Sequence, residues 1–342
     1  MTNYILRDEN ALYFECGYSC DNAIFLSVNG KKFFLTDARY ALEAKECVYA
    51  DVSVIELSRS LVAETRLLLR KLKPKSLVYD PCDFSVATFD MLSQKLGINF
   101  KPKANFLQLK RIIKNPEEIK ILKQASDFGA ACFDEFADFV RQKGEGMSEQ
   151  ELHYNAELIF RQKNRLGLSF SPIVAINENA AKAHALPSEK RLKKGDLLLL
   201  DAGVRYKNYC SDRTRTACFN ESFNFLKEQN FTSSCQQEIY KVVLNAQKAA
   251  LEAIKPGIMA FEVDKAARDV IKKAGYEKEF IHSTGHGVGI DIHELPVVNS
   301  KSKTILKEGM VFSVEPGIYI PNEFGVRIED VVVVRENGAE IL

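Results

Sequence analysis

The chain has 342 residues, which is enough for one large domain or two of ordinary size. Its 47 lysines and arginines nearly balance its 46 aspartates and glutamates, and this balance argues against nucleic-acid binding, which needs a concentrated basic surface. No stretch approaches the roughly 20 apolar residues that span a bilayer, and the first ten residues lack the basic and apolar pattern of a secretory signal. We therefore expect a cytoplasmic protein with no nucleic-acid or membrane partner.

The eight cysteines are scattered along the chain. The closest two, Cys16 and Cys20, form an isolated C-x3-C, which is weak as a metal motif because no second cysteine pair accompanies it. We expect free thiols in a reducing compartment.

Residues 1–109 alternate strand-like and helix-like segments, which predicts a small α/β domain. AIFLSV (23–28) and KFFLTD (32–37) flank Asn29-Gly30, a dipeptide typical of a tight β-hairpin turn. The other predicted elements are a helix directly after Asp37, helices over about 55–73 and about 84–96, and a buried strand over 76–80. Without a phosphate-binding loop or an acid-histidine cluster, this region is expected to position or oligomerise the chain and not to catalyse.

The character of the sequence changes near residue 110, where we place the boundary of the second domain, 110–342. Asn115-Pro116 followed by acidic residues predicts the start of a long helix. Apolar residues recur at helical spacing after this start: Ile119, Leu122, Ala125, Phe128, Ala131 and Cys132.

The second domain contains a weak internal repeat. In each copy a helical segment (143–164 and 255–276) precedes apolar strands, one of which ends in an acid within a D/E-x-G context, and a later strand carries a second acid. The spacings agree: Asp201 to Glu315 is 114 positions, Asp212 to Glu329 is 117, and His184 to His293 is 109. This registration predicts two similar halves.

Four carboxylates stand out because they lie in apolar strands. Asp201 follows LLLL and Asp212 follows the turn-like RYKN, so a hairpin can point both acids to one face. Glu315 ends VFSVE, and Glu329 lies in GVRIEDVVVV, whose apolar run predicts a strand buried on both faces. A buried acid is costly unless it is paired or binds a metal, so the alternatives for any one of them are a salt bridge and a strand-end cap.

Three of the five histidines, His282, His286 and His293, fall within IHSTGHGVGIDIHELP (281–296). The glycines exclude a helical zinc pair, and alternation over 286–293 predicts an extended segment. His153 lies in the helical pattern QELHYNAEL and is predicted to be an ordinary helix-surface residue.

One histidine of this segment and the four carboxylates make an oxygen-rich set of five ligands. Such a set suits two hard divalent ions about 3.5–4 Å apart better than one tetrahedral zinc. The chemistry that this set indicates is metal-assisted hydrolysis.

The motifs DLLLLDAG, SDRTRT, HSTGHGVG, SVEPGIY and GVRIED closely resemble those of the pita-bread metallopeptidases, which include aminopeptidase P, prolidase and methionine aminopeptidase. YFECGYSCDNAIFLS and FFLTDARY are similar to the creatinase-type N-terminal domain. The resemblance implies an α/β (α+β) protein, with a pita-bread catalytic domain of internal pseudo-twofold symmetry over 110–342 and a smaller creatinase-like domain over 1–109.

The resemblance also implies roles for individual residues. The five metal ligands would be Asp201, Asp212, His286, Glu315 and Glu329. Asp212 and Glu329 would bridge two divalent ions, and Glu315 would also shuttle a proton to the leaving amine. His184 and His293 match histidines that contact the substrate and stabilise its tetrahedral intermediate. His282 and Arg327 match substrate-binding residues of the proline-specific members.

The expected activity is hydrolysis, by a metal-bridging hydroxide, of the Xaa-Pro bond at the N-terminus of short proline-containing peptides. Both an Xaa-Pro aminopeptidase and an Xaa-Pro dipeptidase (prolidase) fit. The expected metal is Mn²⁺, ahead of Co²⁺, Zn²⁺ and Fe²⁺, because carboxylates dominate the ligand set, and the family implies a homodimer.

Two alternatives stay open. Methionine aminopeptidase activity is disfavoured by Arg327 and by the N-terminal domain. A non-peptidase binding protein or a creatinase-like enzyme on the same fold is disfavoured because all five ligands are present. The segment 219–240 is longer than the usual connection after the second aspartate and is expected to be a surface loop or a rim element.

Overall fold

The computed structural model describes residues 2–342, and these divide into two units. The first unit ends at Lys110 and the second is Arg111–Leu342. All eight cysteines are free thiols. Within the described residues, no helix has both the length and the apolar character that crossing a bilayer requires.

The first unit contains a six-stranded sheet with the order β4-β3-β2-β1-β5-β6. The hairpin prediction is confirmed: β2 (Ala23–Val28) pairs antiparallel with β3 (Lys31–Thr36), and Asn29 and Gly30 both have positive φ in the turn. The other elements of this unit are β1 (Tyr4–Leu6), α1 (Glu9–Cys16), α2 (Ala38–Cys47), β4 (Val52–Glu56), α3 (Leu61–Leu72), β5 (Ser76–Tyr79), α4 (Val86–Ser93), β6 (Asn99–Pro102) and α5 (Phe106–Arg111).

The helix predicted over 55–73 is wrong at its start. Its first residues belong to β4, which pairs parallel with β3, and α3 begins only after Ser60, whose side chain accepts a hydrogen bond from the Ala63 N–H. Sheet pairing at Ile55 and Glu56 overrides the apolar periodicity there. The strand predicted over 76–80 exists as β5, but only Leu77 is fully buried.

The long helix predicted after Asn115-Pro116 is α6 (Pro116–Lys143). Asn115 and Glu118 close a capping box at its start. Its buried face differs from the predicted one at two positions, because Phe128 and Ala131 are exposed. The Phe128 ring packs edge-on against Tyr206, with the ring centroids 5.0 Å apart.

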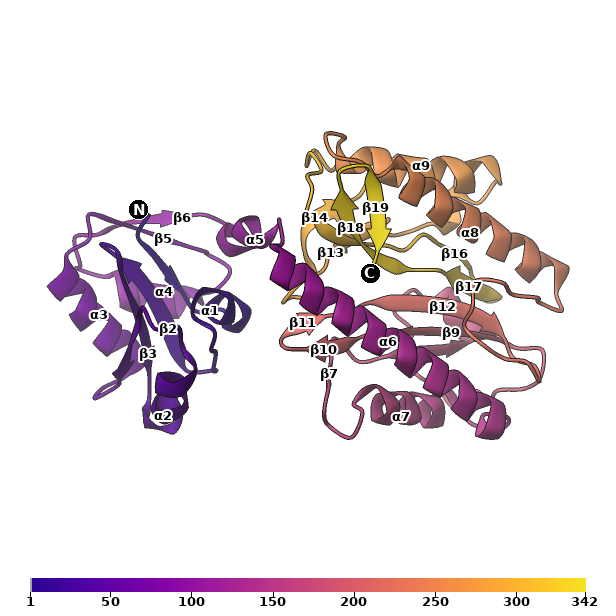
Figure 1. The fold of residues 1–342 in the computed structure, drawn as a ribbon, viewed down its shortest axis with the longest axis horizontal. Helices are drawn as coiled ribbons and strands as arrows, with labels where there is room; N and C mark the ends of the chain where they lie inside the picture. The colour runs from indigo at the N-terminus through magenta and orange to yellow at the C-terminus, as the bar shows by residue number, and fades with distance from the viewer. Residues whose placement is uncertain (1) are drawn as a thin grey trace. The chain divides into compact units, whose positions relative to one another are not determined.

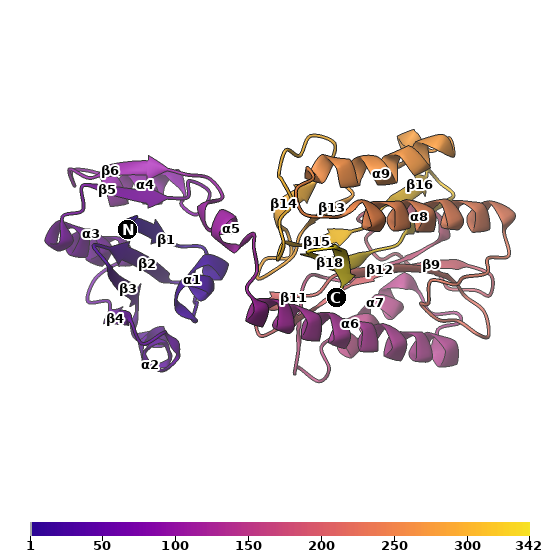
Figure 2. The same ribbon diagram turned by 45° about the horizontal axis from the view of Figure 1, so that its top comes forward.

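The second unit has two halves, as the repeat predicted. One half combines α6 and α7 (Glu149–Phe160) with the sheet β12-β9-β8. The other combines α8 (Ser234–Ala253) and α9 (Ala260–Lys273) with the sheet β14-β13-β15-β18-β19. Both ribbon views show the two helix pairs on opposite sides of the strands (Figures 1 and 2).

The strands of this unit include two smaller sheets, β11-β10-β7 and β16-β17. The bounds are β7 (Gly167–Leu168), β8 (Ile173–Ile176), β9 (Leu197–Ala202), β10 (Val204–Tyr206), β11 (Tyr209–Cys210), β12 (Arg213–Cys218), β13 (Gly285–Gly287), β14 (Glu294–Val298), β15 (Val311–Val314), β16 (Gly317–Ile320), β17 (Phe324–Arg327), β18 (Asp330–Arg335) and β19 (Gly338–Ile341), with short 3₁₀ helices η1 (Asn177–Ala181) and η2 (Glu277–Glu279).

The long segment 219–240 is anchored by its aromatic residues. Phe223 and Phe225 are buried, and the Phe225 ring lies 5.4 Å from that of Phe133 on α6. Burying such a ring stabilises the fold by roughly 2–3 kcal/mol. The segment is therefore packed on the core of the first half, and α8 begins at Ser234 within it.

Candidate metal centre

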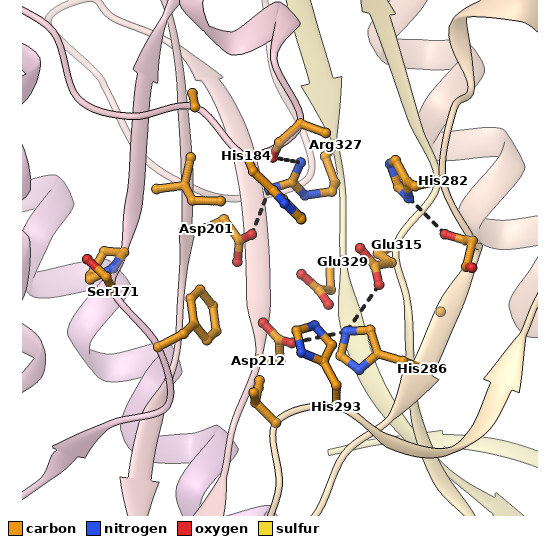
Figure 3. A pocket seen from close by; sticks show the side chains of 18 of the residues that line it. Ser171, His184, Asp201, Asp212, His282, His286, His293, Glu315, Arg327 and Glu329 are labelled. Carbon is orange, nitrogen blue, oxygen red and sulfur yellow. Dashed lines mark hydrogen bonds and ion pairs between the residues drawn. The ribbon is translucent and has the colours of Figure 1, made fainter. Parts of the chain in front are cut away.

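A cavity of about 500 Å³ lies in the second unit. The structure brings all the residues singled out from the sequence to its lining: His184, Asp201, Asp212, His282, His286, His293, Glu315, Arg327 and Glu329. The two halves of the unit contribute opposite walls of this cavity, as the close view shows (Figure 3).

The first two acids come from neighbouring strands. Asp201 is in β9, opposite Thr214 of β12, and Asp212 directly precedes β12. The hairpin of β10 and β11 connects them. Antiparallel pairing therefore places both carboxylates on one face, as the sequence predicted.

The prediction of one continuous strand around Glu329 is wrong. Glu329 lies in the two-residue break between β17 and β18, while Glu315 directly follows β15. At the break the Glu329 N–H donates to Thr214 O (3.1 Å) in β12, so the backbone leaves one sheet and bonds to a strand of the other half. The break directs the carboxylate toward Asp212.

The extended segment predicted over 286–293 is also wrong. His286 is in β13, the chain turns over 288–293, and β14 returns antiparallel beside β13 with a register shift after His286. The turn brings the ring centroids of His286 and His293 to 4.3 Å. A side chain at Gly285 would place its Cβ 1.8 Å from Ser313 O, so the glycine there permits close approach of two backbones.

Three of the predicted ligands form a compact group. Ligand atoms of Asp212, His286 and Glu329 all lie within 4.8 Å of one another. His286 Nε2 is 3.6 Å from Asp212 Oδ2 and 3.3 Å from Glu315 Oε1, which places the fourth ligand at the edge of this group (Figure 3).

The fifth, Asp201, is held by an arginine. Arg327 Nη2 donates to Asp201 Oδ2 (2.6 Å). Arg327 also donates to Thr214 Oγ1, to Ala183 O and to the hydroxyl of Tyr319 (2.8 Å). Arg327 is only 3% exposed, so this network fixes Asp201 against the wall of the cavity.

Sequence reasoning missed two members of this network. The Tyr319 hydroxyl shares a hydrogen bond with His282 Nε2 (2.8 Å), and Thr214 donates through Oγ1 to Glu329 Oε2 (2.6 Å). Both residues stand in quoted motifs, SVEPGIY and SDRTRT, but a tyrosine or threonine in a strand ordinarily predicts packing only.

The carboxylates are strongly perturbed. Burial, and then repulsion by Glu329, raises the pKa of Asp212 well above its usual value, and burial with repulsion by Glu315 does the same for Glu329. Burial raises the pKa of Glu315 to about 7. Burial also lowers the pKa of His286, which favours the neutral ring that a metal ligand needs.

The donor set fits divalent cations. Two buried carboxylate atoms, Asp201 Oδ1 and Glu329 Oε1, have no hydrogen-bond partner among the described residues. Unpartnered buried oxygens beside mutually repelling acids are costly unless a cation compensates them. The oxygen-rich composition of the set is the one that hard divalent ions prefer.

The two remaining histidines, His184 and His153, also line the cavity. His184 lies in the loop after η1 and lines the cavity, as predicted. The residue before it, Ala183, accepts a hydrogen bond from Arg327 through its carbonyl oxygen. His153 is a half-buried surface residue of α7, as predicted, but the sequence did not indicate its place in the cavity lining. It lines the same cavity, and its Nε2 lies 3.1 Å from Ser171 Oγ, because α7 packs its inner side against the segment before β8.

Comparison with known proteins agrees with this geometry. The sequence pattern of metallopeptidase family M24 matches residues 120–336. The Xaa-Pro dipeptidase of Pyrococcus furiosus is 40% identical over 260 residues, which cover 73% of this chain and 71% of that protein.

Solved structures are similar over nearly the whole chain. The Xaa-Pro dipeptidase from Bacillus anthracis has a TM-score of 0.90 at 33% identity, covering 99% of this chain and 92% of that one. The X-Pro aminopeptidase from Thermotoga maritima has a TM-score of 0.87 at 31% identity, covering 100% and 95%. The chain therefore belongs to metallopeptidase family M24, and it has the mixed α/β fold of that family.

Proposed function

We propose that this protein hydrolyses the bond between an N-terminal residue and proline in short peptides. The observation that carries the proposal is the group of Asp212, His286 and Glu329, with Glu315 at its edge, in a cavity that Arg327 also lines. The names of its relatives, Xaa-Pro dipeptidase and X-Pro aminopeptidase, support the substrate class.

Five residues would hold two divalent ions: Asp201, Asp212, His286, Glu315 and Glu329. Asp212 and Glu329, which both belong to the compact group, would bridge the ions. Mn²⁺ is the metal we propose, because four of the five ligands are carboxylates. Bound there, such ions supply a water of lowered pKa and polarise the scissile carbonyl.

The protein's own side chains handle the proton and the substrate. Glu315 accepts a hydrogen bond from Ser313 Oγ (3.0 Å), which orients its carboxylate to hold a proton and pass it to the leaving proline nitrogen. His293 stands against His286 and, with His184, is positioned to donate a hydrogen bond to the oxygen on which charge develops.

A bond to proline suits a dedicated site because proline has no N–H for a general peptidase to bind. His282 and Arg327, joined through the Tyr319 hydroxyl, form a rigid polar wall. Burial and the positive charge of Arg327 lower the pKa of His282 to about 4, so the ring is neutral at pH 7 and packs against substrate without adding charge.

The remaining features of the proposal concern the whole chain. We assign residues 1–109 to a creatinase-like N-terminal domain and residues 110–342 to the catalytic domain. We also propose a cytoplasmic homodimer, on the likeness of the chain to its family.

The test is hydrolysis of Ala-Pro and Ala-Pro-Ala by the full chain supplied with Mn²⁺, with Ala-Ala and Met-Ala-Ser as controls. Cleavage confined to Ala-Pro identifies a dipeptidase, and efficient cleavage of Ala-Pro-Ala identifies an aminopeptidase. Cleavage of Met-Ala-Ser in preference to both proline peptides would establish methionine aminopeptidase activity and reject the proposal. Metal binding without hydrolysis of any of these peptides would also reject it.

A further inference from the structure

The cavity has a second polar feature that the proposed chemistry does not use. His153 of α7 and Ser171, just before β8, both line the cavity, and His153 Nε2 and Ser171 Oγ share a hydrogen bond of 3.1 Å. Neither residue belongs to the carboxylate group or to the Arg327 network. This bond uses one ring nitrogen of His153. The other ring nitrogen has no hydrogen-bond partner among the described residues, so it is available to a ligand.

Three apolar residues that flank Ser171 in the chain, Phe170, Pro172 and Ile173, also line the cavity and are taken together as its apolar wall. Ile173 is the first residue of β8 and stands opposite Asp201 of β9 in the antiparallel ladder. The wall therefore begins beside Asp201 and continues outward to Ser171, which is exposed at the mouth of the cavity.

This wall lies on the side of Asp201 that is away from the second half of the domain. In the close view Ser171 is separated from His282, His286 and Glu315 by the whole width of the site, with Asp201 between them (Figure 3). His282, which belongs to the rigid polar wall described above, lies on the other side of Asp201 (Figure 3). The two ends of a bound peptide thus meet chemically different walls.

The charge of the substrate decides which end meets which wall. A free N-terminal amine is attracted to a carboxylate, and Asp201 is the proposed ligand that stands opposite Ile173 of this wall in the ladder. The residue that carries this amine then lies next to Ile173, with its side chain along Phe170. If that side chain has three or more carbons, its methylene groups pack against Ile173 and Phe170, and its terminal group reaches Ser171 and His153.

We propose that His153, oriented by Ser171, is a specificity-determining residue for the N-terminal residue of the substrate, selecting side chains that end in a carboxylate or amide oxygen, such as Glu and Gln. The inference rests on the proposed Xaa-Pro hydrolysis and names the substrate side chain that it favours. A histidine N–H can donate to such an oxygen, while the apolar wall accepts the methylene groups.

The experiment compares Glu-Pro, Gln-Pro and Leu-Pro, as dipeptides and as Xaa-Pro-Ala tripeptides, with the Mn²⁺-loaded full chain. The variants are His153→Phe, which keeps a ring but removes the donor, His153→Gln, which keeps an N–H, and Ser171→Ala. The control is Tyr154→Phe on the next residue of α7, because Tyr154 is 61% exposed and does not line the cavity.

The expected result is a change in selectivity. In His153→Phe the ratio of kcat/KM for Glu-Pro to that for Leu-Pro falls at least tenfold, and the ratio for Gln-Pro falls with it. His153→Gln restores most of the ratio, Ser171→Ala lowers it less than His153→Phe does, and Tyr154→Phe leaves it within twofold of the wild type.

An unchanged Glu-Pro to Leu-Pro ratio in His153→Phe, with an active wild type, would overturn this inference alone. A wild type that binds Mn²⁺ but cleaves no Xaa-Pro peptide would overturn the proposed function, and the inference with it.

Discussion

Arg327 and Asp201 are 126 residues apart in the chain, yet Arg327 Nη2 donates to Asp201 Oδ2 at 2.6 Å. Arg327 ends β17 in the second half of the domain, and Asp201 is in β9 in the first half. One buried guanidinium thus fixes the distance between the two halves and neutralises one carboxylate of the cluster. Its fork of donors also reaches Tyr319, Thr214 and the Ala183 carbonyl, a geometry that lysine cannot reproduce.

We expect Arg327→Met to lower the free energy of unfolding by about 3–5 kcal/mol, because Asp201 is then buried without its cation. Arg327→Lys should recover only part of this, since one ammonium cannot replace four hydrogen bonds. Tyr319→Phe, which removes one hydroxyl from the same network, should cost about 1–2 kcal/mol. Urea unfolding of the three variants measures these differences, and equal stability of Arg327→Met and the wild type would show that the pair does not stabilise the fold.

The central carboxylates should be required for metal retention. Asp212→Ala and Glu329→Ala each remove one member of the compact group, and we expect loss of bound metal together with at least a 1,000-fold fall in kcat, as expected when a metal that activates water is lost. Elemental analysis of the purified variants beside turnover with an Xaa-Pro peptide makes the measurement. Near-wild-type turnover with full metal in either variant would refute the dinuclear assignment.

His293 should behave differently from those ligands. It lies against His286 but is outside the compact group, so His293→Ala should keep its metal while kcat falls about 100-fold through loss of a hydrogen bond to the developing oxyanion. The same two measurements apply. Loss of metal in His293→Ala would mean that His293 is itself a ligand.

A buried ion pair supports the turn between the two histidines. Lys114 pairs with Glu294, the residue after His293, and both side chains are 1% exposed. A side chain on Gly289 would place its Cβ 2.3 Å from Glu294 Oε1, so the turn 288–293 closes around this carboxylate. Arg111 adds a second, longer contact to Glu294 at 3.5 Å.

We expect Lys114→Met to destabilise the protein by about 3 kcal/mol, because the buried carboxylate of Glu294 then keeps only the Arg111 ion pair. The matched control is Lys123→Met in α6, whose partner Asp127 is exposed, and this change should cost less than about 0.5 kcal/mol. Denaturant unfolding of both variants tests the difference. Similar stability of the two variants would show that burial does not increase the contribution of the Lys114–Glu294 ion pair to the free energy of unfolding.

The sequence was most informative where residue types were out of place. Acids such as Asp201 and Glu315 are conspicuous in apolar strands, and a cluster of histidines among glycines cannot be a helix, so local context marked the four carboxylates and the histidine segment. The roles of His184 and Arg327 came only from the resemblance to the family. The hairpin at Asn29-Gly30 and the cap at Asn115 were predictable for the same reason, because each depends on two or three adjacent residues.

What could not be predicted depends on tertiary packing. His153 has the sequence context of a surface helix and enters the cavity only because α7 lies beside the segment that carries Ser171. The break at Glu329 arises from a hydrogen bond to Thr214, 115 residues away. Residues 55 and 56 join a strand because β3 is available for pairing. None of these partners is visible in a local pattern.

The first unit should carry a pH dependence that is separate from the metal site. Asp83 is partly buried, and burial followed by repulsion from Asp80 and Asp8 raises its pKa to about 7. A carboxyl whose pKa is higher in the folded than in the unfolded state stabilises the fold at pH values below the unfolded pKa, near 4, and this contribution is lost as the pH rises through about 7. Asp83→Asn should therefore be more stable than the wild type at pH 8 and should differ little from it at pH 4.

Urea unfolding of the full chain at these two pH values measures the effect, with Asp90→Asn as the control, since Asp90 is an exposed acid of α4. A stability difference between Asp83→Asn and the wild type that does not change with pH would show that Asp83 does not titrate in this range.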